Sequence, residues 1–283
     1  MSLDEGEERK MIPKIIHYCW FGNNPLPDLA IRCIESWKRL CPHYEIKLWN
    51  EKNFDYNSCP YIQEAYKEKR WAFVSDYARL KVIYENGGIY LDTDVEVLHS
   101  FDNLLSNPCF LGTEIGKDDG GLVNTGLGFG AEKKNKIVKA MLDQYEGIHF
   151  RGANGICDAT PCPERNTVPL LGLGFKYSRN KVWETEDVVV YPPEYFSPMN
   201  YITGETRITE NSYSIHHYSA LWISDKDRDM MRRIEELEKN NGKIVGQVKK
   251  QWMLYRMTKE EGKAKNFVWF VGSKIRLKLM NKR

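Results

Sequence analysis

Short apolar blocks alternate with stretches of helical periodicity along the first hundred residues of the chain. Residues 12–20 and 44–49 are compact apolar runs bounded by turn residues, a pattern typical of buried strands. Apolar positions at three- and four-residue intervals predict helices over 28–40, 61–69 and 71–86. The last helix is expected to stop at Gly87 and Gly88. Strands that alternate with helices predict an α/β fold with a mostly parallel sheet.

The segment 85–98, ENGGIYLDTDVEVL, predicts a strand that carries Asp92 and Asp94 two residues apart. Because residues i and i+2 of a strand share a face, both carboxylates are expected to point the same way. Two like charges held together repel each other unless a cation or a shared proton lies between them. An oxygen-liganded metal is therefore the first hypothesis, and a strand end running into a solvated turn is the alternative.

Five further residues are candidates for a functional site near this acidic motif. Trp20 follows the first predicted strand, where an indole either caps the core or stacks on a planar base. Asp76 and Arg79 share a helix face, either as an ion pair or directed toward a cleft. His216 and His217 are adjacent on a short apolar segment, so only one of them is expected to enter a given site. Two Asp residues and one His form a suitable ligand set for Mn²⁺.

Composition narrows the class of protein. The chain has 283 residues, 42% of them hydrophobic, which is enough for one large globular domain. The seven cysteines are scattered and contain no C-x-x-C pair, and no run of eighteen apolar residues occurs. We therefore expect a cytoplasmic protein with reduced thiols and no transmembrane helix.

The charge is distributed unevenly along the chain. Residues 239–283 carry 13 basic and 2 acidic side chains, whereas residues 1–238 carry 28 basic and 37 acidic ones. The tail also contains Trp269 and Phe270, and aromatic residues beside basic ones suit an anionic membrane surface. A C-terminal helix that packs on the body is the equal alternative. Nucleic acid is not expected as a partner, because no base-reading motif occurs and the acidic body repels phosphates.

Three blocks, IPKIIHYCWFG, WAFVSDYARLKVIYENGGIYLDTDVEVL and IHHYSALW, occur in this order along the chain. Together they resemble the DXD-containing glycosyltransferases of family 32, which include bacterial capsular and lipooligosaccharide transferases and yeast α-mannosyltransferases. A more distant similarity links them to the glucosylating clostridial toxins. The middle block is the most specific, with S-D-x-x-R on a helix and then G-G-I-Y-L-D-x-D. The resemblance implies a GT-A fold, a Rossmann-like α/β domain that binds a nucleotide sugar.

On this basis we expect an N-terminal extension over 1–11 that is disordered, a GT-A domain over 12–225 and a helical basic region over 226–283. The resemblance implies that Asp92 contacts the ribose and the metal, and that Asp94 ligates Mn²⁺ or Mg²⁺ directly. It gives His217 as a further metal ligand, with His216 as the alternative. Asp92, Asp94 and Arg79 form the expected catalytic set.

The resemblance also assigns the remaining contacts of the donor and acceptor. Trp20 would stack on the base, and Asp76 and Arg79 would hold the donor sugar and the nearby phosphate or ribose. Asn124 would contact the donor sugar, and Trp222 would belong to a loop that closes over the diphosphate. Residues 158–161 would line the acceptor side.

The activity implied is a metal-dependent, retaining transfer of a hexosyl group from a nucleotide sugar to a cell-surface glycan, such as a capsular or lipopolysaccharide precursor. A UDP-sugar is favoured as the donor and GDP-mannose is the alternative, while the acceptor is a glycan or a lipid-linked oligosaccharide. Peripheral contact with the inner face of the cell membrane through 239–283 would fit such an acceptor. Two rivals stay open: a carboxylate-based hydrolase, and a non-catalytic module that binds sugar nucleotides or polysaccharide.

Overall fold

The structure is a computed structural model that describes residues 11–115, 120–152, 157–158, 160–200 and 204–219. The chain divides into two compact units, the first made of residues 1–149 and 160–219 and the second of residues 150–159 and 220–283. The described part of the second unit contains a β-bridge between Arg151 and Cys157. All helices and strands below belong to the first unit, which holds the candidate site.

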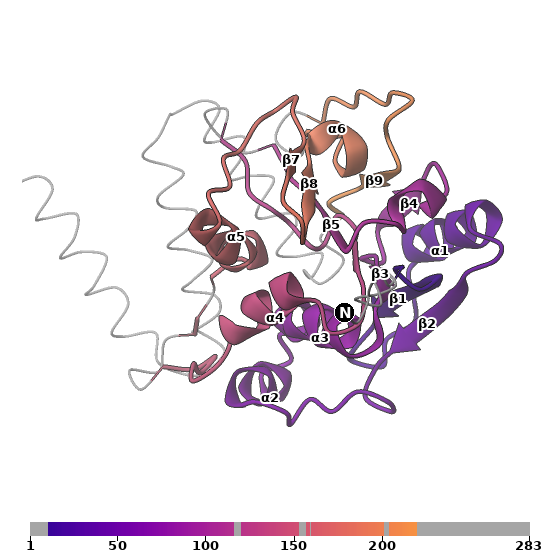
Figure 1. The fold of residues 1–283 in the computed structure, drawn as a ribbon. Helices are drawn as coiled ribbons and strands as arrows, with labels where there is room; N and C mark the ends of the chain where they lie inside the picture. The colour runs from indigo at the N-terminus through magenta and orange to yellow at the C-terminus, as the bar shows by residue number, and fades with distance from the viewer. Residues whose placement is uncertain (1–10, 116–119, 153–156, 159, 201–203, 220–283) are drawn as a thin grey trace, which may run out of the picture. The chain divides into compact units, whose positions relative to one another are not determined.

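A seven-stranded sheet in the order β2-β1-β3-β6-β5-β8-β7 forms the centre of the first unit (Figure 1). Strands β2, β1, β3, β5 and β8 run in one direction, and β6 and β7 run against them. The predicted α/β fold with a mostly parallel sheet is therefore confirmed. The strands of this sheet are β1 (Ile15–Cys19), β2 (Glu45–Trp49), β3 (Gly88–Tyr90), β5 (Cys109–Gly112), β6 (Phe129–Ala131), β7 (Trp183–Glu184) and β8 (Val189–Tyr191).

A separate two-stranded ribbon pairs β4 (Val95–Val97) with β9 (Ser214–His216) in antiparallel register, so that Val95 lies opposite His216. The ribbon joins a strand that directly follows the acidic motif to a segment more than a hundred residues later in the chain. The helices are α1 (Asp28–Leu40), α2 (Pro60–Lys67), α3 (Trp71–Asn86), α4 (Lys136–Asp143), α5 (Cys162–Gly172) and α6 (Pro193–Phe196), with one 3₁₀ turn at Asp102–Leu104.

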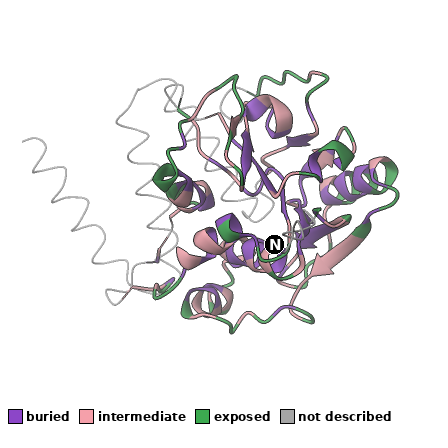
Figure 2. Ribbon diagram, viewed as in Figure 1, coloured by how far each residue is buried: buried purple, intermediate pink, exposed green. Residues whose placement is uncertain are grey.

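Helices α1 and α3 cover opposite faces of the sheet. Trp37 of α1 belongs to the same buried cluster as Ile89 of β3, whereas the next residue, Tyr90, faces Arg79 of α3. Successive residues of a strand point to opposite faces, so the two helices must lie on either side of β3. Helix α4 packs on α3, and α5 packs on α4. Figure 2 shows the buried residues concentrated on the strands and on the inward sides of these helices.

The helix boundaries agree closely with the sequence pattern. Helix α3 ends at the predicted glycine stop, with Gly87 at φ 69°. A Cβ on Gly88 would lie 2.7 Å from the carbonyl oxygen of Ile15, so a glycine is needed for β3 to approach β1 this closely. Gly87 thus ends α3, and Gly88 allows β3, the strand before the acidic motif, to pair closely with β1.

The single strand predicted over 85–98 is wrong. Strand β3 ends at Tyr90, β4 starts at Val95, and Asp92 and Asp94 lie in the turn that joins these two strands of different sheets. Strand alternation is therefore not what brings the carboxylates together. The backbone turns so that the N–H of Val95 donates to the carbonyl oxygen of Asp92 at 3.0 Å.

Among the helices in the described part of the chain, none is both long and apolar enough to cross a membrane. The predicted N-terminal extension, apart from Met11, the basic tail and Trp222 lie outside the described residues. The proposed domain boundaries stay predictions.

Candidate functional site

Helix α1 fixes the acidic turn from behind. The indole Nε1 of Trp37 donates to the carbonyl oxygen of Val95 at 2.7 Å, and the Oγ of Ser36 accepts from the N–H of Val97 at 2.9 Å. Trp37 is completely buried, so these bonds are shielded from water. The strand after Asp94 is thereby attached to the core, and the turn carrying both aspartates is held at the end of β3.

Asp92 is held by a buried cation. The Nη2 of Arg79 lies 3.0 Å and 3.3 Å from the two carboxylate oxygens of Asp92, and 3.1 Å from Asp76. The hydroxyl of Tyr90 also donates to Asp92 at 3.0 Å. The intrahelical pair of Asp76 and Arg79 is thus part of a larger network that reaches the acidic turn.

Burial and charge oppose each other within this network. Burial raises the pKa of Asp76 to about 6, although Arg79 acts in the other direction. Burial disfavours the charge of Arg79, but Asp92, Tyr90 and Asp76 raise its pKa well above the ordinary value. The guanidinium therefore stays charged. Its Nε is buried and has no hydrogen-bond partner within the described residues.

Asp94 is held by a different set of donors. Its Oδ2 accepts from the backbone N–H of Ser219 at 2.9 Å and from the Ser219 hydroxyl at 2.7 Å. The Nε2 of His216 lies 3.3 Å from Oδ1 of Asp94 and 3.8 Å from Oδ2 of Asp92. Burial works against the charge of Asp94, but His216 and Ser219 outweigh it and lower its pKa. Asp94 is therefore an ionised carboxylate at neutral pH.

Asp92, Asp94 and His216 fit a divalent metal ion. One ligand atom from each lies within 4.8 Å of the others. Two carboxylate oxygens and an imidazole are donors that Mn²⁺ accepts, and the carboxylates alone suit Mg²⁺. The Nδ1 of His216 accepts from the backbone N–H of Tyr218 at 3.0 Å. Since a neutral imidazole carries one proton, ligation through Nε2 would require Nδ1 to become protonated and to part from this N–H.

The structure brings His216, and not His217, to the two aspartates. His216 is the last residue of β9 and shares a face with Ser214, so the next side chain points away. The Nε2 of His217 instead lies 3.0 Å from Oε2 of Glu96. This geometry favours the alternative, His216, over His217, and the metal-ligand assignment stays a prediction.

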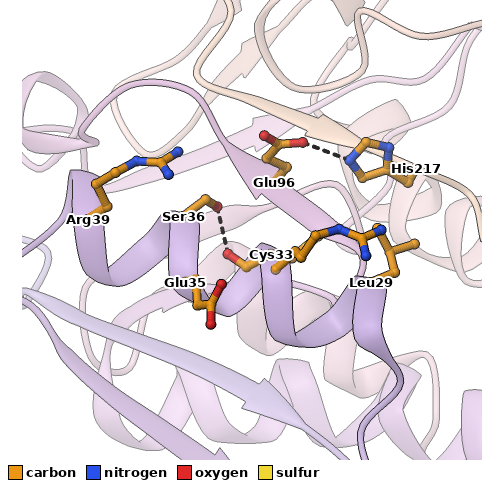
Figure 3. Close-up of a pocket in the computed structure, with 8 residues that line it drawn as sticks. Leu29, Cys33, Glu35, Ser36, Arg39, Glu96 and His217 are labelled. Carbon is orange, nitrogen blue, oxygen red and sulfur yellow. Dashed lines mark hydrogen bonds and ion pairs between the residues drawn. The ribbon is translucent and has the colours of Figure 1, made fainter.

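His217 and Glu96 line a separate pocket of about 360 Å³ beside α1 (Figure 3). Its other lining residues come from α1: Leu29, Arg32, Cys33, Glu35, Ser36 and Arg39. Neither aspartate of the acidic turn lines this pocket. This pocket is therefore distinct from the carboxylate cluster.

Asn124 is connected to the acidic turn by Gly126, which is hydrogen-bonded to Asn124 and lies against Asp92. The Oδ1 of Asn124 accepts from the N–H of Gly126 at 2.7 Å. A Cβ on Gly126 would lie 2.5 Å from Oδ2 of Asp92 and 3.1 Å from Nη1 of Arg79, so a glycine is needed for this close approach. The structure thus places the predicted donor-sugar residue beside Asp92 and Arg79.

Trp20 directly follows β1 and is partly buried, with its Nε1 donating to the carbonyl oxygen of Asn24 at 2.7 Å. It therefore occupies the carboxyl end of a strand next to β3. Asp158 belongs to the second unit, and Ala159 lies outside the described residues. The base contact, the acceptor side and the role of Trp222 stay predictions.

Four residues of the site were not predicted from the sequence: Tyr90, Cys162, Ser219 and Glu114, whose Oε2 accepts from the Nδ2 of Asn124 at 2.7 Å. Tyr90 precedes Asp92 by two positions, and Ser219 follows His216 by three, so their proximity to the motifs was a usable signal. Cys162 lies on α5, with Sγ 3.5 Å from Nη1 of Arg79. Burial raises the pKa of its thiol to about 12, so it is a neutral packing and hydrogen-bonding group. No local pattern links Cys162 or Glu114 to the acidic turn.

Residues 27–111 match the family described as "Glycosyltransferase sugar-binding region containing DXD motif". This segment is therefore similar to the sugar-binding region of the DXD glycosyltransferases. The match spans α1, α3 and the acidic turn, and confirms the resemblance for this part of the chain. The five strands with a common direction agree with the expected GT-A architecture. A DXD sugar-binding region implies a nucleotide sugar and a divalent metal.

Curated relatives match a similar length of chain. Inositol phosphoceramide mannosyltransferase 3 of Schizosaccharomyces pombe is 32% identical over 113 residues, which cover 35% of this chain and 29% of that protein. Subversion of eukaryotic traffic protein A of Legionella pneumophila is 24% identical over 121 residues, covering 33% of this chain and 19% of that protein. The matches thus span less than a third of the length of these relatives.

Solved glycosyltransferase structures are similar at lower identity. PaToxG glycosyltransferase matches with a TM-score of 0.46 and 20% identity, over 58% of this chain and 70% of that one. The galactosyltransferase LgtC, in complex with donor and acceptor sugar analogs, matches with a TM-score of 0.39 and 17% identity, over 80% of this chain and 95% of that one.

Proposed function

We propose that this protein is a metal-dependent, retaining glycosyltransferase that moves a hexosyl group from a nucleotide sugar to a glycan acceptor. The observation that carries the proposal is the convergence of Asp92, Asp94 and His216 at the end of β3, with Arg79 bonded to Asp92. The match of residues 27–111 to a DXD sugar-binding region supports it.

The chemistry needs a stabilised leaving group. Departure of a nucleoside diphosphate leaves negative charge on phosphate oxygen, and a divalent cation supplies Lewis-acid stabilisation there. Asp94, Asp92 and His216 would hold that cation, which is Mn²⁺ or Mg²⁺ on this proposal. Arg79 keeps Asp92 in place and would hold the nearby phosphate or ribose of the donor. Asp76, Asn124 and Trp20 would orient the sugar and the base.

A front-face substitution fits this site best. A double displacement needs a carboxylate nucleophile at the anomeric carbon. Asp92 and Asp94 are both committed to donors within the described residues, Asp92 to Arg79 and Asp94 to Ser219. We infer that the leaving phosphate helps to deprotonate the acceptor, and that catalysis rests on positioning and electrostatics.

Metal-dependent release of nucleoside diphosphate tests the proposal. The purified chain is incubated with UDP-glucose, UDP-galactose, UDP-N-acetylglucosamine or GDP-mannose, with Mn²⁺ or with a chelator. We expect one donor to be turned over with Mn²⁺, no activity in chelator, and recovery when Mn²⁺ is restored. Full activity in chelator would overturn the metal-dependent mechanism and favour a carboxylate-based hydrolase. An inverting hydrolase needs its two carboxyl groups roughly 6.5–9.5 Å apart. The ligand oxygens of Asp92 and Asp94 lie within 4.8 Å of each other, which suits a shared metal better.

A non-catalytic binding module is the second candidate, because the family match covers a sugar-binding region and is limited to residues 27–111. It predicts thermal stabilisation by a sugar nucleotide without product. Stabilisation by a donor together with Mn²⁺ identifies the ligand, since a ligand stabilises only the state that it binds. The absence of nucleoside diphosphate release, with and without glycan acceptors, would then decide for the module.

A UDP-sugar is our first choice of donor, and GDP-mannose is the alternative. The acceptor we propose is a cell-surface glycan, such as a lipid-linked oligosaccharide. The net charge of +11 over 239–283 supports peripheral contact with an anionic membrane. Binding of the full chain to phosphatidylserine vesicles, compared with a chain that ends at residue 238, tests this contact. Equal binding of the two chains would rule it out.

A further inference from the structure

Glu114 lies two residues beyond the end of β5, opposite the segment that carries Asn124. The N–H of Glu114 donates to the carbonyl oxygen of Leu122 at 3.0 Å, and the N–H of Asn124 donates to that of Gly112 at 3.0 Å. Thr113 and Val123 form the antiparallel bridge between them. In this register Glu114 and Asn124 are diagonal neighbours on the same face of a short ladder.

The two side chains are hydrogen-bonded in one defined orientation. The Nδ2 of Asn124 donates to Oε2 of Glu114 at 2.7 Å, and the Oδ1 of Asn124 accepts from the N–H of Gly126 at 2.7 Å. A carboxylate only accepts and a backbone N–H only donates, so both contacts require the same placement of the amide oxygen and nitrogen. Asn124 therefore has its amide direction set from both sides.

The oriented amide of Asn124 is connected to the acidic turn by Gly126. Gly126 lies so close to Asp92 and Arg79 that a Cβ there would be 2.5 Å from the Asp92 carboxylate. The bond from Gly126 to Asn124 keeps the backbone in that place. Glu114, Asn124, Gly126 and Asp92 form a continuous series of contacts from the ladder to the proposed metal ligands.

We propose that Glu114 is a positioning residue, whose carboxylate fixes the amide of Asn124 so that Asn124 meets the donor sugar and Gly126 supports Asp92. The inference rests on the proposed function, because it assigns Glu114 a part in the same site. Glu114 acts through Asn124 and does not itself touch the reacting atoms. Its contribution is the direction of one amide and the position of one backbone segment.

The first test separates the hydrogen bond of Glu114 from its charge. Rates are measured with the sugar nucleotide that the wild type turns over. Glu114→Ala removes the acceptor, and we expect kcat to fall by about tenfold, the size of one hydrogen bond to a charged group. Glu114→Gln keeps an oxygen that can accept from Asn124, so we expect kcat within about threefold of the wild type. Glu45→Gln, an exposed carboxylate on β2, is the matched control.

The second test exchanges the two partners. Asn124→Asp alone sets two carboxylates against each other at a hydrogen-bond distance, and we expect the largest loss of the series, about a hundredfold in kcat. Adding Glu114→Gln restores a donor opposite an acceptor, and the aspartate oxygen still accepts from Gly126. We expect the double variant to recover at least about tenfold of the lost rate.

Three results would overturn the inference. A Glu114→Ala variant as active as the wild type would show that the contact does not matter. A Glu114→Gln variant as slow as Glu114→Ala would show that the negative charge acts directly, as a catalytic carboxylate would. A double variant as slow as Asn124→Asp would show that the two side chains are not coupled.

A readout without activity separates this inference from the proposed function. Urea unfolding of the wild type, Glu114→Gln, Asn124→Asp and the double variant measures the coupling between positions 114 and 124. We expect the double variant to be more stable than the two single changes predict, by at least about threefold in the unfolding equilibrium constant. If the wild type releases no nucleoside diphosphate from any donor, the proposed function fails. Absence of coupling in urea would instead refute the contact itself.

Discussion

His216 and His217 are neighbours in the chain, yet they face carboxylates in very different surroundings. His216 is 9% exposed, and its Nε2 lies 3.3 Å from Asp94, within reach of Asp92 as well. His217 lines an open pocket and pairs with Glu96, whose side chain is 41% exposed. Both imidazoles can form an ion pair with a carboxylate. Only His216 lies beside two carboxylates at once, of which Asp94 is buried and Asp92 is partly buried.

The difference between the two histidines shows that the surroundings of an imidazole, and not its residue type, decide whether it can belong to a metal site. An exposed ion pair is worth about 0–1 kcal/mol, because water and salt screen it. In the buried cluster the same charges interact more strongly, and burial raises the cost of leaving either one unpaired. The two sides of the ribbon should therefore respond very differently to matched substitutions.

The largest contrast is expected between Asp94→Asn and Glu96→Gln. Asp94→Asn removes one negative ligand from the buried cluster, and we expect turnover with Mn²⁺ to fall on the order of a thousandfold, because several kcal/mol of electrostatic stabilisation are lost. Glu96→Gln, two residues later on the other side, should keep the rate within about threefold. Steady-state rates and circular dichroism of both variants check this. A near-normal rate for Asp94→Asn would refute its assignment as a ligand.

The two histidines give the next contrast. His216→Gln is expected to raise the Mn²⁺ concentration needed for half-maximal activity by about a hundredfold, because an imidazole next to two carboxylates is lost. His217→Gln should leave that concentration unchanged. A titration of activity with Mn²⁺ measures both. The reverse result would restore His217 as the ligand.

A third histidine, His17 on β1, extends the comparison to an imidazole without a carboxylate. Burial is the main cause that lowers its pKa to about 4, and its Nδ1 accepts from the indole Nε1 of Trp49. The folded chain therefore keeps His17 neutral, while the unfolded chain takes up a proton below pH 6.5. Stability is full above pH 6.5 and falls as the pH drops toward 4, by about 3 kcal/mol.

Urea unfolding between pH 7 and pH 4 measures this loss. In His17→Gln, which cannot titrate, the part of the pH dependence that belongs to His17 should disappear. His17→Gln is the matched comparison because it keeps a side-chain acceptor for Trp49. An unchanged pH dependence in this variant would show that His17 is not the titrating group.

The smallest effect is expected for the partly exposed pair of His217 and Glu96. Glu96→Gln and His217→Gln should each change the free energy of unfolding by less than about 1 kcal/mol at pH 7. Thermal and urea unfolding check both variants. A loss of several kcal/mol would mean that the pocket beside α1 is structurally as important as the buried cluster.

The helix and strand periods predicted much of the fold because they depend on local burial patterns. Helix α1, for example, spans the predicted residues, and α3 ends where two glycines stop it. The turn between β3 and β4 was not predicted. Residues 88–97 look like one apolar strand, and only pairing with two different partners, β1 and β9, divides them. Pairing over such distances leaves no local signal.

The sequence by itself determined the DXD motif, its link to an S-D-x-x-R helix, and the list of acidic, basic and imidazole groups available for chemistry. These depend on residue types at short spacings. Tertiary structure decided which groups meet: it brought His216 to the aspartates, directed His217 to Glu96, and placed Glu114 against Asn124. The physical reason is that these contacts depend on strand register and on the side of the ribbon each residue occupies. A one-residue shift in register reverses both.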